Sequence, residues 1–559
     1  MPHSVHEIAA WLNEIGKRTE LSGETFKARA YYTAAENLSG YSGDLAELIA
    51  TGKVKTIPGV GEAIAEKIIR LHKTGTHPTL EFLREQYPDG LLEMFEIPGL
   101  GVKKIEIVWK TLGITTLDAL EAACKAGQVA ACKGLGKALE AKILKGLEMR
   151  YKTAGSMLAD TAEARLIDAQ DQLRESSEAG SFEAVEIAGD ARRGCELVTN
   201  LVIAASAKGT PPVHDLPPDV TVRVSKPERF GVNLLYATGS DAHVAALVAR
   251  ASKLGMRLSP NGLSRGDTDI PCPAEADVYS ALKLPVIPPE LREGRNEIEL
   301  AEKKALPKLV ENKDLRGILH SHTVFSDGTR SLNDMAEAVR KRGYEYYGVA
   351  DHSKSAAYAR GLKEDRVLEQ QKMADELNAA YGKNGKKNFH IFKGIESDIL
   401  EDGKLDYADD FLMHFDFIVA SIHSRFTLGK AEQTQRLINA VSHPRTTILG
   451  HLTGRLLLRR EGYEIDIEAV LKACAEHGVA VEINAHPPRL ELDWRWHQRA
   501  LEMGCILSIN PDAHDISEID MVKYGVNVAR KGGVPANKVL NCMTLDEIAA
   551  HFEKRKKRR

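Results

Sequence analysis

Nine histidine, aspartate and glutamate residues in the C-terminal part of the chain follow short apolar runs, where buried strands are expected to end. They are His320, His322, Asp327, His352, Glu396, His423, His451, Asp512 and His514. A His-x-His or Asp-x-His pair at a strand end aims two side chains into one space, because alternate residues of a strand face the same way. Imidazoles mixed with carboxylates suit Mn²⁺, Zn²⁺ or Fe²⁺. Such ions activate water, so the pattern predicts a metal-dependent hydrolytic site.

The elements that position these residues lie within residues 315–559. Apolar runs such as "YYGVADHS", "FDFIVASIHS" and "CILSINPDAH" alternate there with helical segments that stop at glycine. Seven buried strands alternating with helices favour a parallel α/β barrel. Chemistry in such barrels lies at the C-terminal strand ends, where the nine residues fall. Of the 19 histidines in the chain, 13 lie in this part, which agrees with a metal-rich barrel.

A second stretch, "VEIAGDARRGCELVTNLVIAASA" (185–207), predicts a strand, a glycine turn, a short helix and another strand. Gly-x-x-Arg-Arg-Gly in such a turn is typical of nucleotide-transferring enzymes, which use it to hold a triphosphate. Those enzymes need two carboxylates, two residues apart, on the strand that follows, since Mg²⁺ prefers anionic oxygen. This strand offers Asn200 and Val202 instead. Asp190 also places a negative charge in the turn.

The first 150 residues read as helices joined by glycine turns. Three segments share an apolar lead, Gly-x-Gly and an amphipathic helix: "IPGVGEAIAEKI" (57–68), "IPGLGVKKIEIV" (97–108) and "CKGLGKALEAKI" (132–143). Gly59, Gly61, Gly99 and Gly101 would let the backbone approach a phosphate, and the N–H groups that begin the next helix would hold it. A plain helical hairpin turn is the alternative for one copy alone. The repetition favours DNA binding that is blind to base sequence.

The order of these motifs resembles family X DNA polymerases of the bacterial type over essentially the whole chain. "TFKARAYYTAAENL" (25–38) resembles the lyase domain of that family, and "LLYATGSDAHVAAL" (234–247) is similar to its nucleotide-selection segment. The C-terminal part resembles a polymerase-and-histidinol-phosphatase (PHP) domain. The resemblance implies a multidomain fold: an all-α helix-hairpin-helix region, an α/β nucleotidyltransferase-like palm with a thumb, and a distorted (β/α)₇ TIM-like barrel. The expected boundaries are a lyase-like domain at 1–85, a fingers-like domain at 86–150, a palm at 151–240, a thumb at 241–300, a linker at 301–314 and the PHP domain at 315–559.

The resemblance also implies a degenerate polymerase site. The family binds two metal ions through three aspartates, and the matching positions here are Asn200, Val202 and Thr221. Thr221 lies in "DVTVRVSKPERFG". A shifted register would bring in Glu196 and Asp219, but it would leave Asn200 and Val202 without carboxylates.

Two lysines match family positions near the first hairpin. Lys27 matches a phosphate-binding lysine, and Lys67 matches the lysine that forms a Schiff base with an abasic sugar. Such a lysine must be partly deprotonated. A surface or phosphate-contacting lysine is the alternative for Lys67.

The PHP resemblance matches all nine metal-type residues to family ligand positions and implies three divalent ions, Mn²⁺, Zn²⁺ or Fe²⁺. It also implies attack on phosphorus by a hydroxide that these ions generate. Arg360, Arg455 and Arg489 are candidates for binding the substrate phosphate. Ordinary salt bridges are the alternative for each arginine.

Composition limits the partners. The net charge of −4 over 559 residues excludes a global basic field, so a DNA site must be a local patch. The seven cysteines form no Cys-x-x-Cys pair, which is typical of reduced thiols in a cytoplasmic protein. No apolar run is long enough to span a membrane. We expect a monomer that binds gapped, nicked or 3′-ended DNA.

We therefore expect a DNA-binding, metal-dependent 3′-5′ exonuclease of DNA repair, which also cuts at abasic sites and whose polymerase site is inactive. The main alternative is an active gap-filling polymerase with a PHP exonuclease. A DNA-binding scaffold with a structural metal, and a small-molecule phosphatase, are two further alternatives. Open ligand sets argue against the scaffold, because structural zinc sites are closed and four-coordinate. The N-terminal hairpins argue against the small-molecule phosphatase.

Overall fold

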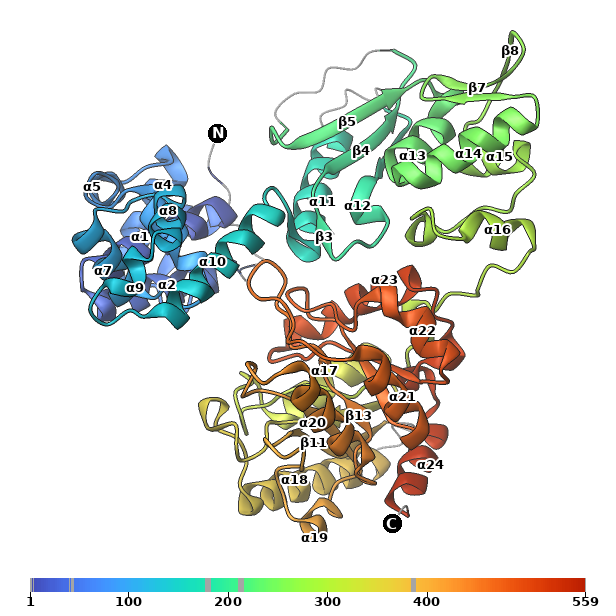
Figure 1. The fold of residues 1–559 in the computed structure, drawn as a ribbon. Helices are drawn as coiled ribbons and strands as arrows, with labels where there is room; N and C mark the ends of the chain where they lie inside the picture. The colour runs from blue at the N-terminus through green and yellow to red at the C-terminus, as the bar shows by residue number, and fades with distance from the viewer. Residues whose placement is uncertain are drawn as a thin grey trace. The chain divides into compact units, whose positions relative to one another are not determined.

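The computed structural model describes residues 3, 5–39, 41, 45–175, 182–209, 216–383 and 389–557. The chain forms two compact units, Met1–Ala154 and Gly155–Arg559 (Figure 1).

Every secondary-structure element described in the first unit is a helix. Its longer helices are α1 (Val5–Leu21), α2 (Thr25–Ser39), α4 (Glu62–Thr74), α5 (Pro78–Gln86), α7 (Val102–Leu112), α8 (Leu117–Lys125) and α10 (Lys137–Lys152). Shorter helices are α3 (Leu45–Ala50), α6 (Asp89–Glu93) and α9 (Gln128–Ala131). One core contains Leu12 and Ile68, and a second contains Ile105 and Leu147. The division at residue 85 stays a prediction, and the helices on either side of it belong to different cores.

The second unit begins with a small mixed sheet. Strand β4 (Leu201–Ser206) lies between β2 (Ala184–Ile187), which is antiparallel to it, and β5 (Val220–Ser225), which is parallel. A two-residue pair, β1 (Met157–Leu158) and β3 (Leu197–Val198), lies beside it. Helix α11 (Ala159–Glu175) packs on one face through Leu166 and Leu173. Helix α13 (Phe230–Thr238) packs on the other face through Phe230 and Leu234. The assignment of this sheet to a palm stays a prediction.

The predicted thumb has its own core. Helices α14 (Asp241–Lys253), α15 (Glu275–Ala281) and α16 (Glu297–Glu302) accompany a three-stranded antiparallel sheet, β6 (Arg257–Ser259), β7 (Gly262–Arg265) and β8 (Thr268–Ile270). Val232 and Leu235 of α13 also enter this core, so one helix serves both parts. Residues 301–314, the expected linker, are tied to the barrel, because the Val310 N–H donates to the Val534 carbonyl at 2.9 Å.

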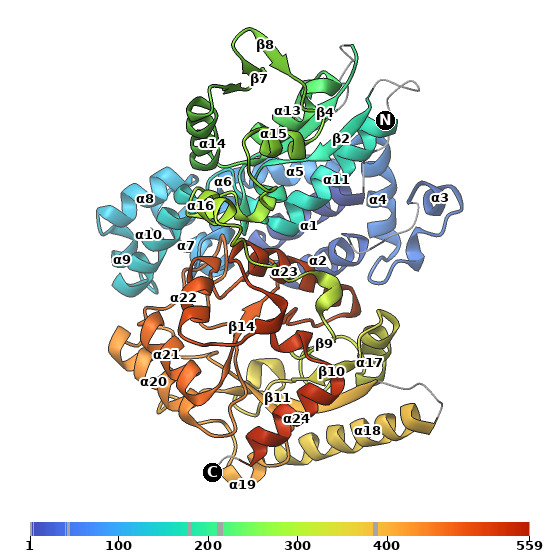
Figure 2. The same ribbon diagram turned by 90° about the vertical axis from the view of Figure 1, so that its right-hand side faces the viewer.

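The C-terminal part is a seven-stranded parallel barrel. Its strands, in the spatial order of the sheet, are β9 (Gly317–Ile318), β10 (Tyr346–Val349), β11 (His390–Asp398), β12 (Phe417–Ser421), β13 (Ile448–Leu449), β14 (Ala480–Asn484) and β15 (Leu507–Asn510). The fully buried strand β12 shows why these apolar runs form strands, because helices cover the outside of the sheet. The surrounding helices are visible in Figure 2: α17 (Leu332–Lys341), α18 (Glu364–Lys383), α20 (Lys430–Ser442), α21 (Ile467–His477), α22 (His497–Glu502), α23 (Val522–Lys531) and α24 (Leu545–Lys556).

One hydrogen bond to a side-chain amide and one between backbone groups link the first strand region to the last. The Leu319 N–H donates to Asn510 Oδ1 at 3.2 Å, and the His322 N–H donates to the Ala513 carbonyl at 2.8 Å. This nearly closed barrel confirms the fold class predicted for the C-terminal part. Among the residues that the structure describes, no helix is both long and apolar enough to cross a membrane.

Candidate metal centre

The nine metal-type residues predicted from the sequence meet at the C-terminal ends of the barrel strands. Glu396 lies on β11, and the other eight lie in the segments that follow β9, β10, β12, β13 and β15. Most of the nine are buried, whereas Asp327 and His514 are 31% and 33% exposed at their side chains. The cluster therefore has a buried floor and one open side.

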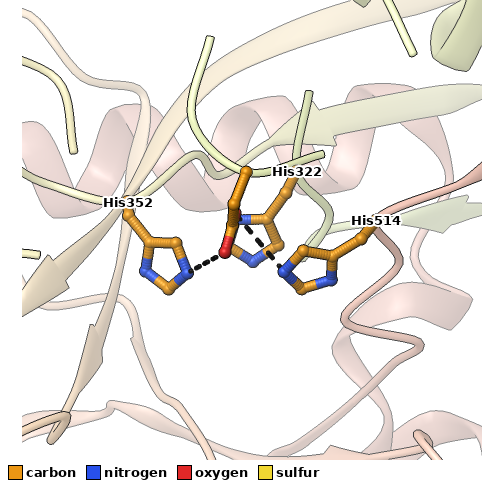
Figure 3. Close-up of side chains that lie close together, drawn as sticks. His322, His352 and His514 are labelled. Atoms are coloured by element: carbon orange, nitrogen blue, oxygen red, sulfur yellow. Dashed lines mark ion pairs between the residues drawn. The ribbon is translucent and has the colours of Figure 1, made fainter. Parts of the chain in front are cut away.

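Three groups of side chains lie close enough to share a metal ion. They are His322 with Asp327, His352 and His514; His320 with His322 and Asp512; and His352 with Glu396 and His423. In each group the candidate ligand atoms lie within 4.8 Å of one another. Figure 3 shows the rings of His322, His352 and His514 gathered around one space.

The carboxylate of Glu396 lies at the centre of the cluster. Its Oε1 lies 2.9 Å from His451 Nε2 and 3.2 Å from His423 Nε2, and its Oε2 lies 2.8 Å from His352 Nδ1. His320 Nε2 approaches Oε1 at 3.4 Å. Both oxygens of one carboxylate thus face imidazoles from several strand ends.

Several buried polar atoms of the cluster make no hydrogen bond of ordinary geometry within the described part of the chain, although His352 Nδ1 and Glu396 Oε2 lie only 2.8 Å apart. These atoms are His320 Nε2, His322 Nδ1, His352 Nδ1, His451 Nδ1 and Glu396 Oε2. Buried polar atoms are almost always satisfied, so a group of unsatisfied ones calls for a missing ligand. Nitrogen and carboxylate donors fit divalent Mn²⁺, Zn²⁺ or Fe²⁺.

Electrostatic effects in the cluster differ between its histidines. Burial and the neighbouring His514 and His352 lower the pKa of His322 to about 3, whereas carboxylates raise the pKa of others. Although burial opposes ionisation, the surrounding histidines hold the pKa of Glu396 well below its usual range. Burial lowers the pKa of His352, but Glu396 and Asp327 outweigh it and raise that pKa to about 10. Asp327 and Asp512 likewise outweigh burial and raise the pKa of His514 to about 9. Without metal the site keeps protons as its counter-charges, and cations can replace them.

Three buried carboxylates that the sequence analysis missed hold this cluster in place. Glu482 Oε1 on β14 lies 2.7 Å from His320 Nδ1, and Asp398 Oδ1 lies 2.6 Å from His423 Nδ1. Asp351 accepts a hydrogen bond from the Thr323 N–H at 2.8 Å, in the loop after β9. Such partners fix the orientation of metal-binding histidines. Acidic residues within the apolar runs "VAVEINAH", "GIESD" and "GVADHS" were the available signal.

The three candidate phosphate-binding arginines occupy different settings. Arg489 lies at the cluster, with its Nε 3.6 Å from Asp512 Oδ2. Arg360 is exposed, in the segment that follows β10. Arg455 donates to the carbonyls of Arg489 and Leu490 and to Asp493 Oδ2, so its guanidinium supports the loop that carries Arg489. A direct phosphate contact from any of the three stays a prediction.

The Gly-x-Gly segments form hairpins with one shared backbone geometry. Gly59, Gly99 and Gly134 have φ angles of 76°, 93° and 89°, which glycine adopts without strain. The second glycine of each copy precedes a helix: Gly61 before α4, Gly101 before α7 and Gly136 before α10. The weakest sequence match, at residues 132–143, thus has the same geometry as the other two.

The two lysines near the first hairpin are accessible. Lys27 is exposed on α2 and its Nζ donates to Glu24 at 3.2 Å. Lys67 is half-buried on α4, and its Nζ donates to the Ala63 carbonyl at 3.3 Å. Their roles in phosphate binding and Schiff-base chemistry stay predictions.

The strand register places the positions matched to the family's metal-binding aspartates next to one another. Val202 on β4 pairs directly with Thr221 on β5, and Asn200 precedes β4 by one residue. The acidic residues considered for a shifted register have other partners. Asp219 pairs with Arg165 at 2.7 Å, and Glu196 pairs with Arg495 of the barrel at 2.8 Å.

Both arginines of the triphosphate-type turn are paired with acidic side chains. Arg192 binds both carboxylate oxygens of Glu275 on α15, at 3.0 and 2.7 Å. Arg193 donates to Asp190 at 2.5 Å and to Glu293 at 2.9 Å. Asp190 also accepts from the Thr199 N–H at 3.0 Å, so it closes the turn as well as adding charge.

Comparisons with known proteins match the parts in the same order. Family models match a helix-hairpin-helix domain at residues 3–77, a SAM-like helix-hairpin-helix tandem at 91–149, a DNA polymerase beta thumb at 233–293 and a PHP domain at 319–486.

Curated relatives fall into a long class and a short class. The chain is 34% identical to the DNA polymerase/3′-5′ exonuclease PolX of Bacillus subtilis (strain 168), over 98% of this chain and 99% of that protein. Probable phosphatases of Thermoanaerobacter sp. (strain X514) and Shewanella sp. (strain MR-4) are 26% and 27% identical. They match 43% and 40% of this chain and 95% and 85% of their own lengths. Because the similarity to the long relative spans both chains, this chain belongs to the family X DNA polymerases that carry a C-terminal PHP domain.

Proposed function

We propose that this protein is a metal-dependent phosphodiesterase that trims DNA 3′ ends in repair, with its chemistry in the PHP barrel. The observation that carries the proposal is the cluster of nine side chains at the strand ends, in which five buried polar atoms make no hydrogen bond to the described residues. The full-length relative is named a DNA polymerase/3′-5′ exonuclease, and the barrel-length relatives are named probable phosphatases. Hydrolysis of a phosphate ester is the chemistry that both names share.

The three groups of ligand atoms would hold up to three ions. Glu396 belongs to one of these groups and also contacts His451. When bound, the ions supply activation of water and neutralisation of phosphate charge. The buried histidines and carboxylates hold their positions through Glu482 and Asp398. The partly exposed Asp327 and His514 would mark the side from which the DNA phosphate enters. Arg489 lies close enough to contact it.

We infer that the palm-like site does not transfer nucleotides. Asn200, Val202 and Thr221 provide no carboxylate for Mg²⁺. Arg192 and Arg193 already bind Glu275, Asp190 and Glu293, so an incoming triphosphate would have to displace these ion pairs. This part of the chain would then act as a scaffold that positions DNA.

DNA binding is assigned to the N-terminal hairpins. Each presents the start of a helix after a close glycine turn, where N–H groups and the helix dipole favour a phosphate. Contacts of this kind hold any DNA sequence, as an enzyme that trims ends requires. The net charge of −4 makes these local contacts necessary.

The test uses a 5′-labelled gapped primer–template and Mn²⁺, with and without deoxynucleoside triphosphates. We expect the primer to shorten equally in both. The double variant His320→Ala/His322→Ala should not shorten it, and Asp327→Asn repeats the test with a smaller change at the open side. His443→Ala is the matched control, because His443 pairs with Asp409 outside the cluster.

Template-dependent lengthening would overturn the inactive-polymerase inference and favour the gap-filling alternative. If the double variant still shortens the primer, the nuclease activity does not depend on the barrel cluster. A duplex with one abasic site, run alongside, asks whether the same cluster also cuts there.

A further inference from the structure

One aromatic side chain stands exposed beside the metal-ligand cluster. Tyr358 is 70% exposed, the largest exposed fraction among the large apolar side chains described in the barrel. Its ring centroid lies 5.9 Å from that of His352 and 6.3 Å from that of His423. Both histidines belong to one candidate ligand group together with Glu396. Tyr358 thus faces solvent directly beside this candidate ligand group.

The segment that carries Tyr358 is fixed by its surroundings. It forms a short helical turn, Ala357–Ala359, between two well-anchored ends. On one side the Ser355 N–H donates to Asp406 at 2.6 Å, and on the other the Leu362 N–H donates to the His352 carbonyl at 2.8 Å.

Close packing adds to this anchoring. Ala356 and Ala359, on either side of the tyrosine in the chain, are buried. A Cβ atom on Gly361 would lie 1.9 Å from the Ser353 carbonyl oxygen, so the segment packs directly on the chain that follows β10. The backbone is held while the ring is left open to solvent.

Single exposed apolar side chains are common on protein surfaces, so it is the closeness of this ring to the candidate ligand group that points to a role. Nucleobases stack on aromatic side chains, and such stacking tolerates any base because every base has a flat π-face. A ring beside a phosphate-cleaving site is well placed to receive the base attached to that phosphate. A paired base would have to leave its helix first, so the partner is an unpaired terminal nucleotide.

We propose that Tyr358 is a stacking platform for the terminal base of a single-stranded or frayed DNA 3′ end. This proposal rests on the proposed nuclease function and names its substrate as an unpaired 3′-terminal nucleotide. Tyr358 would bind and align that nucleotide, while the metal-ligand cluster cuts the phosphodiester bond next to it.

The test uses the full-length protein with Mn²⁺ and two 5′-labelled single strands. One ends in a normal 3′ nucleotide, and the other ends in a tetrahydrofuran residue that has no base. For the normal end we expect Tyr358→Ala to raise KM about 5- to 150-fold, the range that loss of one stacked base implies. For the baseless end, KM of the same variant should stay within about twofold of the wild-type value. Tyr358→Phe should keep the wild-type KM for both, because stacking needs only the ring.

Met413→Ala is the matched control, since Met413 is also exposed, at 53%, but lies before β12 at the opposite end of the barrel. Met413→Ala should leave KM unchanged for both strands. An equal loss on both substrates in Tyr358→Ala would mean that the tyrosine only supports the site. An unchanged KM for the normal end would also overturn the proposal.

A second readout separates this proposal from the proposed function. A strand with 2-aminopurine as its 3′-terminal base should lose fluorescence on binding to the wild-type protein and retain it with Tyr358→Ala. If the wild-type protein cuts neither strand, the nuclease proposal fails. The fluorescence measurement then still tests whether Tyr358 stacks on the terminal base. Equal fluorescence with both proteins would overturn the stacking proposal.

Discussion

The palm-like site and the barrel cluster differ in whether their charged side chains are fully paired within the chain. In the palm-like turn, Arg192 and Arg193 are bound by Glu275, Asp190 and Glu293. In the barrel, five buried polar atoms of the cluster make no hydrogen bond to the described residues, although oppositely charged groups surround them. Both regions lie at strand ends: the turn follows β2, which is antiparallel to β4, and the cluster follows the parallel strands of the barrel. The barrel alone keeps open ligand positions.

The difference distinguishes charged side chains that stabilise the fold from charged side chains that are available to bind a ligand. A buried ion pair whose partners are all in the chain is complete, and it holds its elements together. A buried carboxylate with several imidazoles and unsatisfied nitrogens is incomplete without a ligand. Glu275 and Glu396 are both buried acids, and the contrast between them can be tested directly.

The largest expected effect is the loss of nuclease activity in Glu396→Gln. The amide keeps the size of the side chain but removes the charge that faces four histidines. We expect a loss in rate larger than the roughly 10- to 100-fold that is typical of changes outside the ligand shell. Initial rates of primer shortening and the bound metal content would both be measured.

This variant should still fold, because the amide can accept a hydrogen bond from a neutral imidazole. Its free energy of unfolding without metal should match that of the wild-type protein or exceed it. Full activity with a normal metal content would show that Glu396 is not a metal ligand.

The second prediction concerns Glu275, the acid that joins the thumb to the palm-like turn. Glu275→Gln leaves Arg292, which is fully buried, and Arg192 without their carboxylate. Removing one partner of a buried pair costs about 3–5 kcal/mol in free energy of unfolding. Urea unfolding of the full chain should show this loss, while nuclease rates stay unchanged. Glu302→Gln is the matched control, because Glu302 forms an exposed pair with Arg250.

The same pair predicts a pH dependence. Burial raises the pKa of Glu275, but hydrogen bonds from Arg192 and Arg292 outweigh it and hold the pKa below its ordinary value. The stabilisation is therefore present above the pKa of the unfolded chain, near 4.3, and is lost as pH falls through the lower folded value. The stability difference between wild type and Glu275→Gln should shrink in acid. A constant difference down to pH 3 would contradict it.

A smaller effect is expected at Glu482, which orients His320 without lying in a ligand group. Glu482→Gln weakens the contact with His320 Nδ1 and should lower Mn²⁺ affinity about 10- to 100-fold. Titration calorimetry with Mn²⁺ would measure the affinity. At saturating Mn²⁺ the rate should recover, which distinguishes an orienting residue from a metal ligand. A rate that stays low at saturation would assign Glu482 a direct part in catalysis.

The sequence predicted the barrel and its nine strand-end residues because side-chain period and strand-end position are local properties. "FDFIVASIHS" has an apolar run and then a histidine, and the structure ends β12 two residues before His423. Glu482 and Asp398 were missed because an acid inside an apolar run has no meaning until its partner, 162 or 25 residues away, is known. The pairing of Arg192 with Glu275, 83 residues apart, was hidden for the same reason.

The smallest expected effect, none at all, comes from restoring carboxylates to the palm-like site. The triple change Asn200→Asp, Val202→Asp and Thr221→Asp places three acids on adjoining positions, because Val202 pairs with Thr221. Made together with Glu396→Gln to prevent trimming, it should still add no nucleotide to a gapped primer. The arginines needed for the triphosphate stay bound to Glu275 and Glu293, which a nucleotide must displace at the cost of a buried arginine left unpaired. Primer extension with the four natural triphosphates is the measurement. Template-dependent lengthening would show that the missing carboxylates alone account for the inactive site. It would also show that an incoming nucleotide can displace the ion pairs of the two arginines.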